Sequence, residues 1–434
     1  MYLEVFERII AEWLERSLPE LVKRSVEIKT DKENINAVIG PRRVGKTSLM
    51  FYTIKNLLKN SKKEEVLFID FEDNRLSGIS SNDLDELFVA HRELTGIEPK
   101  YLFFDEIQEA PNWSKFIRRL HNSGKYHIVI SGSSSKLLSR EIATELRGRY
   151  KSTLLLPFSF KEFVKLKKFE YNSKTGHSEK KGLLLSLLKE YMTSGGFPLV
   201  AKKTDPSEKR DIVRTYYETI FYKDIAERHK VENIDIMQAL MSHVLDNNSS
   251  LFSISTFEKI LKEKGVKASK KTVSLYLKYL EDAFFVFSTQ KFSYSSKVRS
   301  LNPKKIYLSD NSFQTFLSTN FSPDNGKLLE ALIIQELKRR EAQVFYFKEK
   351  KECDFIIKNG REIEAVQVSY EIAENNKERE ISGLLEAMDK LKTGIGTIIT
   401  FDQEQEIAAE GKKIKVLPAW KWLLANEQIQ TKQD

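Results

Sequence analysis

Cysteine and histidine are scarce in this sequence, and long apolar runs are absent. One cysteine, Cys353, and six histidines occur in 434 residues. A single thiol cannot form an internal disulfide, and a few scattered histidines argue against a structural zinc site. The sequence has neither a membrane-length apolar run nor a basic-then-apolar N-terminal segment, so we expect no membrane span and no secretion signal. These absences predict a cytoplasmic protein without a membrane partner.

The charge of the chain is positive and unevenly distributed. The formal net charge is +9, and residues 251–310 contain 12 Lys or Arg against 5 Asp or Glu. Such a cluster favours a polyanion such as double-stranded DNA as a partner, although solubility alone also explains it. Because 41% of the residues are hydrophobic, the chain can form buried cores, and its length predicts two or three domains.

A glycine-rich segment near the N-terminus matches the phosphate-binding pattern G-x-x-x-x-G-K-[ST]. It follows an apolar strand at 35–39 and precedes a helical pattern at 46–59, so the helix N-terminus faces the bound anion. The lysine would contact the β- and γ-phosphates of ATP, and the threonine hydroxyl would bind Mg²⁺. Nucleotide contacts are expected from Gly40, Pro41, Arg42, Arg43, Val44, Gly45, Lys46, Thr47 and Ser48. The two arginines either touch the nucleotide or are solvated loop charges.

Two acidic residues follow an apolar strand at 101–104 and supply the carboxylates that a phosphate-binding loop needs. Asp105 would hold Mg²⁺ together with Thr47, and Glu106 would orient and deprotonate the attacking water. Two acids after a strand also suit a helix N-terminus, where they interact favourably with the helix dipole. Combined with the loop, however, the pair predicts hydrolysis of ATP with Mg²⁺ as cofactor.

Further strands complete an alternating pattern of strands and helices. The segment 65–73 and the start of the segment 126–139, which ends in a serine-rich turn before a helix, are predicted to form strands of a parallel α/β sheet, whose ligands bind at the carboxyl ends of the strands. Ser131 and Ser133 lie near the end of the second strand, where a polar side chain could reach the γ-phosphate or the attacking water. Capping of the next helix explains the two serines equally well.

Two arginines precede the last strand of this region, which is expected at 152–155. Arg147 and Arg149 are either charges that stabilise a helix C-terminus or candidates for an arginine finger, and Arg149 is the better candidate. An arginine finger stabilises phosphoryl charge at the site of a neighbouring subunit. This interpretation therefore predicts a homo-oligomer.

Several segments along the chain resemble a group of prokaryotic AAA-superfamily ATPases that carry a C-terminal domain of unknown function. They are, in order, GPRRVGKTS, FFDEIQEAPNW, SGSSSKLLS, LRGRY, LPFSFKEF, SGGFP and YYETIFYKDIAERHKV. The resemblance covers nearly the whole chain. It implies an ATP site built from Lys46, Thr47, Asp105 and Glu106, with Arg147 or Arg149 as the arginine that acts on a neighbour. It implies no particular substrate.

The middle of the chain, from residue 166 to 248, is predicted to be mostly helical after a polar loop at 170–182. By the resemblance, these helices form a lid behind the nucleotide. The helical pattern is interrupted at 195–198 by the sequence Gly-Gly-Phe-Pro. The break is either a hinge whose angle follows the state of ATP or an ordinary turn between helices.

Residues 249–320 show the order of a winged helix: a helix at 256–264, a second helix capped by Ser269, and strands at 285–297 as the wing. Phosphate contacts with DNA would come from Lys270, Lys271 and Lys278 on the second helix and from Lys291 and Lys297 on the wing. The second helix has no Arg, Asn or Gln for a bidentate base contact, so DNA binding would be weakly specific and salt-dependent. A spacer beside the ATPase is the alternative role.

Residues 321–434 follow the α-β-β-β-α-β order of a restriction-endonuclease-like core. Nucleases of this kind need an Asp on one strand and a Glu-x-Lys on the next, where carboxylates hold Mg²⁺ and the lysine positions water. Asp354 fits the first position, and Glu330 or Glu336 could supply a carboxylate from the preceding helix.

The second nuclease strand lacks the lysine. If Gln367 takes the glutamate position, Ser369 stands where the lysine should be, and if Glu364 takes it, Val366 stands there. Lys348 or Lys350 could replace the lysine only from a neighbouring segment. We therefore interpret this region as a degenerate nuclease fold that binds a partner or DNA.

The predicted architecture is α/β, with an AAA-type P-loop NTPase sheet, a helical lid, a winged helix and a restriction-endonuclease-like domain. Its boundaries are expected at 1–165, 166–248, 249–320 and 321–434. The predicted function is an ATP-driven switch or remodelling ATPase that acts on DNA or a protein client. The alternatives are a metal-dependent DNA nuclease that ATP licenses, and an interaction module that ATP locks with negligible hydrolysis.

Overall fold

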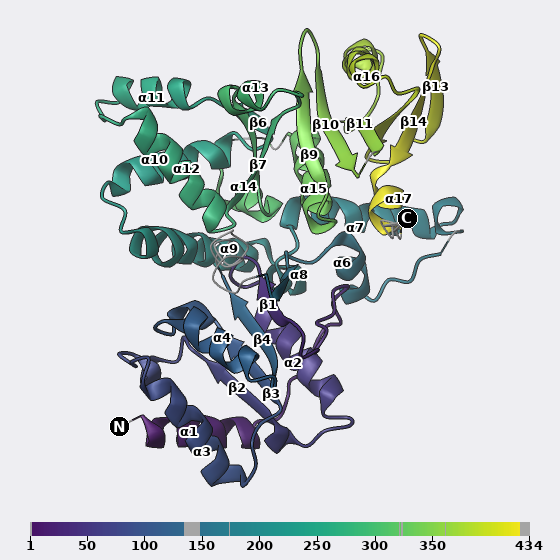
Figure 1. Ribbon diagram of the computed structural model, residues 1–434. Coiled ribbons are helices and arrows are strands. Elements are labelled where there is room, and N and C mark those ends of the chain that lie inside the picture. Colours follow the sequence, from purple (N-terminus) through teal and green to yellow (C-terminus); the bar gives the residue numbers. More distant parts are fainter. Residues whose placement is uncertain are drawn as a thin grey trace. The chain divides into compact units, whose positions relative to one another are not determined.

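The computed structural model in Figure 1 describes residues 2–133, 148–172, 174–320, 322, 324–360 and 362–425. The chain divides into two compact units, the first comprising Met1–Leu156 with Asp282–Phe284, and the second Pro157–Glu281 with Phe285–Asp434. The predicted division into four segments is finer and remains a prediction. Among the described helices, none combines the length and the apolar character needed to cross a membrane.

The first unit contains a five-stranded sheet in the order β2-β3-β4-β1-β5, in which every pair of neighbours is parallel. Helices pack around this sheet (Figure 1). Its main elements are α1 (Leu3–Glu15), β1 (Ile35–Ile39), α2 (Lys46–Leu57), β2 (Val66–Asp70), α3 (Glu86–Thr95), β3 (Tyr101–Asp105), α4 (Trp113–Asn122), β4 (His127–Gly132) and β5 (Tyr150–Leu154). The predicted parallel α/β sheet is confirmed.

The turn between β1 and α2 needs glycine at two positions. A Cβ atom on Gly40 would lie 1.9 Å from the carbonyl oxygen of Leu155, so only glycine lets the loop pass the end of β5. Gly45, at the N-cap of α2, has a φ of 94°, which side-chain-bearing residues rarely adopt. These two constraints place the first turn of α2 at the carboxyl end of β1.

The second unit begins with helices and continues into a large sheet. Its helices are α6 (Phe160–Leu166), α7 (Lys180–Ser194), α8 (Pro198–Lys202), α9 (Pro206–Thr219), the π-helix η7 (Ile220–Glu227), α10 (Ile234–Asp246), α11 (Ile254–Glu263), α12 (Lys270–Asp282), α13 (Ser296–Leu301), α14 (Asn311–Leu317), α15 (Asn325–Arg339), α16 (Lys377–Leu391) and α17 (Ala419–Leu424). The mostly helical character predicted for 166–248 is confirmed.

The sheet of the second unit has nine strands in the order β13-β14-β12-β11-β10-β9-β7-β8-β6. These strands are β6 (Ser250–Phe252), β7 (Val286–Lys291), β8 (Lys304–Leu308), β9 (Gln343–Lys348), β10 (Glu352–Asn359), β11 (Glu362–Val368), β12 (Ile395–Thr400), β13 (Gln405–Ala409) and β14 (Lys412–Pro418). The sheet is mixed, because β7 pairs parallel with β9 but antiparallel with β8.

The segment predicted as a wing does not form a two-stranded hairpin. Its first half is β7, whereas Lys297 lies in the short helix α13, whose N-cap is Ser295. The Ser295 hydroxyl accepts a hydrogen bond from the Val298 N–H, which favours a helical turn over a continuing strand. The placement of Lys297 on a wing was therefore wrong.

The C-terminal order of elements agrees with the predicted α-β-β-β-α-β sequence from α15 to β12. The predicted final strand corresponds to β14, but one strand, β13, was missed. It pairs antiparallel with β14 across a turn at Gly411, which has a φ of 73°. The apolar core of this region lies between α16 and the sheet, and includes Ile356, Leu384 and Met388.

Candidate functional site

Lys46 is buried at the centre of the phosphate-binding loop, with 5% of its surface exposed. Its ammonium Nζ donates to the carbonyl oxygens of Gly40 and Pro41, at 3.3 and 3.1 Å. The same nitrogen lies 3.1 Å from Oε1 of Glu106. The loop lysine and the predicted catalytic carboxylate are thus in direct contact.

The loop is held from outside by Arg24, a residue that the sequence pattern did not indicate. Its two terminal nitrogens donate to the carbonyl oxygens of Val44 and Leu156, each at 2.7 Å. Only 7% of Arg24 is exposed, so these charge-assisted hydrogen bonds are formed away from water. No local motif marks an arginine that lies before the first strand and acts on the loop by tertiary packing.

Thr47, Asp105 and Ser131 form one hydrogen-bonded group at the carboxyl ends of β3 and β4. The Thr47 hydroxyl donates to Oδ2 of Asp105 at 2.5 Å, and the Ser131 hydroxyl donates to Oδ1 of the same carboxylate. The structure therefore brings together the two residues predicted to hold Mg²⁺. Ser131 thus contacts the carboxylate of Asp105, and its predicted role at the γ-phosphate or the attacking water stays a prediction.

Glu106 has a left-handed backbone conformation, with a φ of 46°. Such a conformation is costly for a residue with a side chain and is found mainly where function requires it. The Glu106 N–H donates to the Ser131 hydroxyl at 3.1 Å, which supports this conformation. Oε2 of Glu106 accepts from the Ser133 N–H at 3.1 Å and from Nε2 of Gln108 at 2.6 Å. The carboxylate is therefore fixed from both sides.

The acids at this edge of the sheet have opposite pKa shifts. Burial alone would raise the pKa of Glu106, but Lys46, Gln108 and Arg42 outweigh it and lower the pKa to about 2. Burial raises the pKa of Asp105, although hydrogen bonds from Ser131 and Thr47 oppose this effect. While it is paired with Lys46, Glu106 is thus a stable anion and a weak base.

Asp70 is a third acid at this edge, and the sequence analysis did not single it out. It ends β2 and stands opposite Asp105 in the strand register. Burial raises the pKa of Asp70 from 3.8 to about 6, and the nearby Asp105 adds to the shift. The sequence did contain an indication of this residue. Asp70 is an acid in the predicted strand that precedes, along the chain, the strand ending at Asp105.

We expect Asp70→Asn to stabilise the fold at neutral pH. The raised pKa means that the contribution of Asp70 to stability is full below its unfolded value of 3.8 and is lost as pH rises through about 6. Asparagine cannot ionise, so the variant should gain about 1 kcal/mol near pH 8, after allowance for partial exposure, and nothing near about pH 4. Urea unfolding across this pH range measures the gain.

The matched control is Asp73→Asn, because the hydrogen bond from Arg75 lowers the pKa of Asp73. This change should reduce stability at neutral pH. A gain in stability of equal size in both variants would contradict the conclusion that ionisation of Asp70 destabilises the fold.

The remaining predicted nucleotide residues have different surroundings. Arg42 pairs with Glu72, with 2.5 Å between Nη1 and Oε1. Arg43 is exposed and has a φ of 66°. Arg149 is also exposed, and its Nη1 donates to Oδ1 of Asn122 at 2.6 Å, next to the edge strand β5. Arg147 lies outside the described residues.

The three lysines predicted on the second helix of the winged-helix region lie along one hollow in the second unit. Lys270, Lys271 and Lys278 project from α12 into a cavity of about 810 Å³, which also includes exposed Leu275 and Leu301. Lys291 and Lys297 do not line this hollow. The hollow therefore combines three of the five predicted lysines with apolar side chains, and the role of all five at DNA stays a prediction.

Three of the five predicted nuclease residues line a second cavity, of about 700 Å³, in the C-terminal part of the second unit. These are Glu330, Asp354 and Gln367. Glu336 instead pairs with Arg339 and Arg340.

Glu364 points away from this cavity as well. It accepts a hydrogen bond from the Thr397 hydroxyl at 2.7 Å. Glu336 is therefore not the helix carboxylate of this cavity, and Glu364 does not take the glutamate position. Both side chains have other partners, on other faces of their elements.

A lysine from an unexpected strand completes this cavity. Nζ of Lys305, on β8, lies 2.7 Å from Glu330, 3.0 Å from Glu352 and 2.9 Å from Asp354. The nuclease pattern predicts a lysine on β11 or on a neighbouring segment. The actual one is some sixty positions earlier and reaches the site only through the tertiary fold.

Comparison with known families assigns three segments of the chain. Residues 32–164 match the model of an AAA domain. Residues 185–324 and 325–422 match two domains of unknown function, DUF8612 and DUF4143. The first unit is thus an AAA-type P-loop domain, and regions of unassigned role follow it.

Curated relatives align over nearly the full length. An uncharacterized protein of Methanocaldococcus jannaschii is 38% identical over 97% of this chain and 95% of its own. An uncharacterized protein of Haemophilus influenzae is 30% identical over 91% of this chain and 95% of its own.

Two solved structures are similar to this chain. A Walker-type ATPase of Pyrococcus abyssi has a TM-score of 0.41 and 15% identity, covering 72% of this chain and 95% of its own. The Aeropyrum pernix Orc1 protein in complex with DNA has a TM-score of 0.29 and 12% identity, covering 78% and 93%.

Proposed function

This chain belongs to the same protein family as the uncharacterized Methanocaldococcus jannaschii relative, and we propose that its AAA domain hydrolyses ATP to switch the state of a bound partner. The observation that carries this proposal is the continuous network from Lys46 through Glu106 and Ser131 to Asp105 and Thr47. The network connects the lysine that would bind phosphate, the glutamate that would act as the base, and the two side chains whose oxygens could bind a metal ion.

The residues present fit Mg²⁺ beside the phosphates. The Thr47 hydroxyl and the Asp105 carboxylate offer hard oxygen donors 2.5 Å apart, the ligand type that Mg²⁺ prefers. Thr47 and Asp105 would hold the ion, whose charge would offset that of the phosphates. Lys46 would bind the terminal phosphates, and Glu106 would orient the attacking water and accept its proton.

The contact between Lys46 and Glu106 supports a switch. Phosphate oxygens compete with Glu106 for the ammonium of Lys46, because both are anions and the ammonium has few donors. As Lys46 turns toward phosphate, Glu106 loses its strongest pKa-lowering neighbour, which makes the carboxylate a stronger base. The base therefore becomes effective only when nucleotide is bound.

We expect double-stranded DNA to bind through the lysine hollow on α12 with a steep dependence on salt. ATP turnover should be measured with double-stranded DNA, single-stranded DNA and no DNA, and binding should be followed by fluorescence anisotropy across salt concentrations. Lys271→Glu with Lys278→Glu should weaken binding and reduce the salt slope by about 1 per lost contact.

Lys297→Glu is the matched control, since Lys297 is exposed but does not line the hollow. DNA binding that responds equally to both changes would argue against the hollow as the DNA site. An absence of DNA binding at low salt would leave a protein client as the partner.

We further propose that Arg149 acts on the nucleotide of a neighbouring subunit, since it is exposed beside an edge strand. Lys46→Ala and Arg149→Ala should each be inactive alone. Mixing them should recover up to about a quarter of the turnover, because some sites then combine an intact loop with an intact arginine. Turnover that does not recover on mixing, with both proteins folded, would contradict shared sites.

A further inference from the structure

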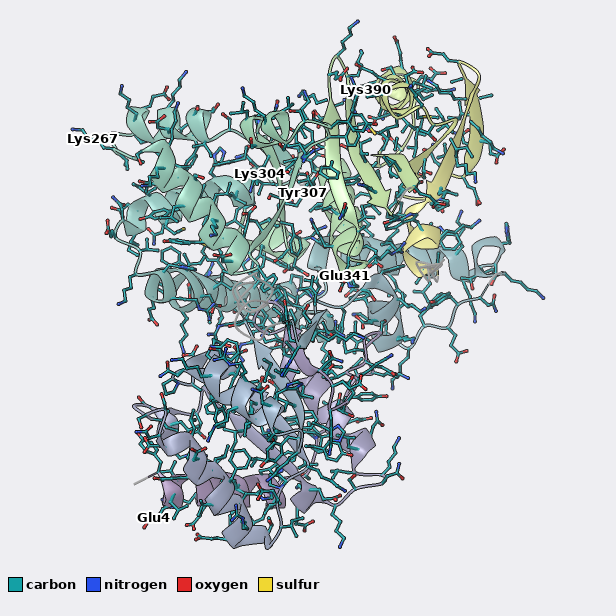
Figure 2. All side chains as sticks on the ribbon, viewed as in Figure 1. Glu4, Lys267, Lys304, Tyr307, Glu341 and Lys390 are labelled. Carbon is teal, nitrogen blue, oxygen red and sulfur yellow. The ribbon has the colours of Figure 1, made fainter. Side chains whose placement is uncertain are left out.

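Lys305 has no remaining hydrogen-bonding capacity for a ligand. It lies on β8 between Lys304 and Tyr307, two of the residues labelled in Figure 2, and only 3% of it is exposed. An ammonium has three N–H donors. The three carboxylates at 2.7–3.0 Å, from Glu330, Glu352 and Asp354, match that number.

The carboxylates are also occupied by other partners. Oδ2 of Asp354 accepts from the Val368 N–H at 3.0 Å, while Oδ1 faces Lys305. Oε2 of Glu352 pairs with Lys348 at 3.1 Å, while Oε1 faces Lys305. Each oxygen of these two carboxylates therefore already has a partner within the chain.

Two further residues complete the set of contacts. Oε1 of Glu330, which faces Lys305, also accepts from the hydroxyl of Tyr307 at 2.7 Å. Gln367, at the position where the nuclease pattern expects a glutamate, accepts from the Asp354 N–H and donates to Glu380. The neutral amide adds no negative charge to the cavity.

These contacts do not fit the Mg²⁺ that a restriction-endonuclease-like core implies. A metal at Asp354 would either displace the ammonium from Oδ1 or lie directly beside the positive charge of Lys305, 2.9 Å from that oxygen. Within the described ranges, no group of three or more His, Cys, Asp or Glu side chains is arranged to hold a metal ion. The residues around Lys305 therefore disagree with a Mg²⁺ site because a lysine ammonium already contacts the carboxylates.

We propose that the ammonium of Lys305 is the permanent cation of this cavity and takes the carboxylates that a nuclease would use for Mg²⁺. The cavity then lacks the Mg²⁺ that phosphodiester hydrolysis would need. Lys305 lies in the 185–324 region, whereas its three carboxylates lie in the 325–422 region, so the same ion pairs join the two regions.

The test is Mn²⁺ binding to the intact chain, followed by the electron paramagnetic resonance signal of the free ion. A background of Asp105→Asn, without nucleotide, removes the metal ligand expected at the phosphate loop. The parent in this background should show no saturable binding. Adding Lys305→Ala should create one saturable Mn²⁺ site and a Tm that rises with Mn²⁺, and adding Asp354→Asn should remove both gains.

Lys304→Ala is the matched control, since Lys304 is the neighbour on β8 and pairs with Glu281 instead. It should behave like the parent. A folded Lys305→Ala protein that gains no Mn²⁺ site would overturn the proposal.

Two measurements need no change at position 305. Mn²⁺ binding by the parent that is lost in Asp354→Asn would show that a metal reaches the carboxylates beside Lys305, and would overturn the proposal. So would Mn²⁺-dependent nicking of supercoiled plasmid by the wild-type chain that Asp354→Asn abolishes. Equal Mn²⁺ binding by the parent and Asp354→Asn, with intact plasmid, supports the internal cation.

Discussion

Glu106→Gln is expected to lower the rate of ATP hydrolysis by about 10²–10⁴-fold while ATP still binds. Glutamine keeps the size of the side chain and can accept from the Ser133 N–H and contact Gln108, so the geometry at the end of β3 is preserved. It cannot accept a proton from water. The loss should therefore appear in kcat, with little change in KM.

Binding of ATP to Glu106→Gln should be equal to wild type or tighter. In the wild-type chain, Lys46 must leave the Glu106 carboxylate, 3.1 Å away, before it can bind phosphate fully. A neutral glutamine weakens this competition. Equilibrium binding of a fluorescent ATP analogue and steady-state turnover, measured on the same preparation, separate the two effects.

The control for the chemistry is Gln108→Ala, which removes a hydrogen bond to Glu106 but leaves the base. It should cost far less than Glu106→Gln. Equal turnover by wild type and Glu106→Gln would disprove the role of this carboxylate. A wild-type chain that binds ATP tightly but turns over at the rate of Glu106→Gln would favour the interaction module without hydrolysis.

Lys305→Ala is expected to lower the free energy of unfolding by about 3–5 kcal/mol, because it leaves buried carboxylates without their counter-charge. Burial alone would lower the pKa of Lys305, but Asp354 and Glu330 hold it well above its ordinary value. The lysine is therefore charged at neutral pH. Its removal leaves the Glu352 and Asp354 carboxylates without their cation, and it leaves Glu330, whose pKa burial raises to about 8, without an ion-pair partner.

Lys304→Ala serves as the comparison in the same strand. The Lys304–Glu281 pair is partly exposed, so its loss should cost no more than about 1 kcal/mol. Urea unfolding followed by circular dichroism measures both. Similar losses for the two variants would show that the contacts of Lys305 contribute no more than a surface ion pair.

The parts of the site that were predictable from the sequence are those whose contacts are local. The loop from Gly40 to Thr47 is determined by the glycines and by the helix that begins at Lys46, so the pattern alone located it. Asp105 and Glu106 were found because they follow an apolar strand directly. The partners of Glu106 were not predictable, since Ser131 and Ser133 reach it only across two neighbouring strands.

Residues that act through tertiary packing were missed. Arg24 binds the loop from an irregular segment, and Lys305 joins its three carboxylates from a strand outside the nuclease-like pattern. Neither position belongs to a periodic or spaced motif. The wing was mispredicted only in its second half, where the Ser295 cap begins α13, and the pairing of β7 with β9 was not predictable because the two strands are more than fifty residues apart.

The parallel pairing of β7 with β9 bears on how the protein can be dissected and how it can move. The register joins Gln290 to Phe345 and Lys291 to Tyr346, on opposite sides of the family boundary at residues 324 and 325. A truncation at that boundary would split a sheet and leave two open edges, which favours aggregation. A cut after Leu156 follows the boundary between the two compact units instead. Because one sheet contains strands of both regions of unknown function, the two regions cannot separate without breaking the β7–β9 pairing.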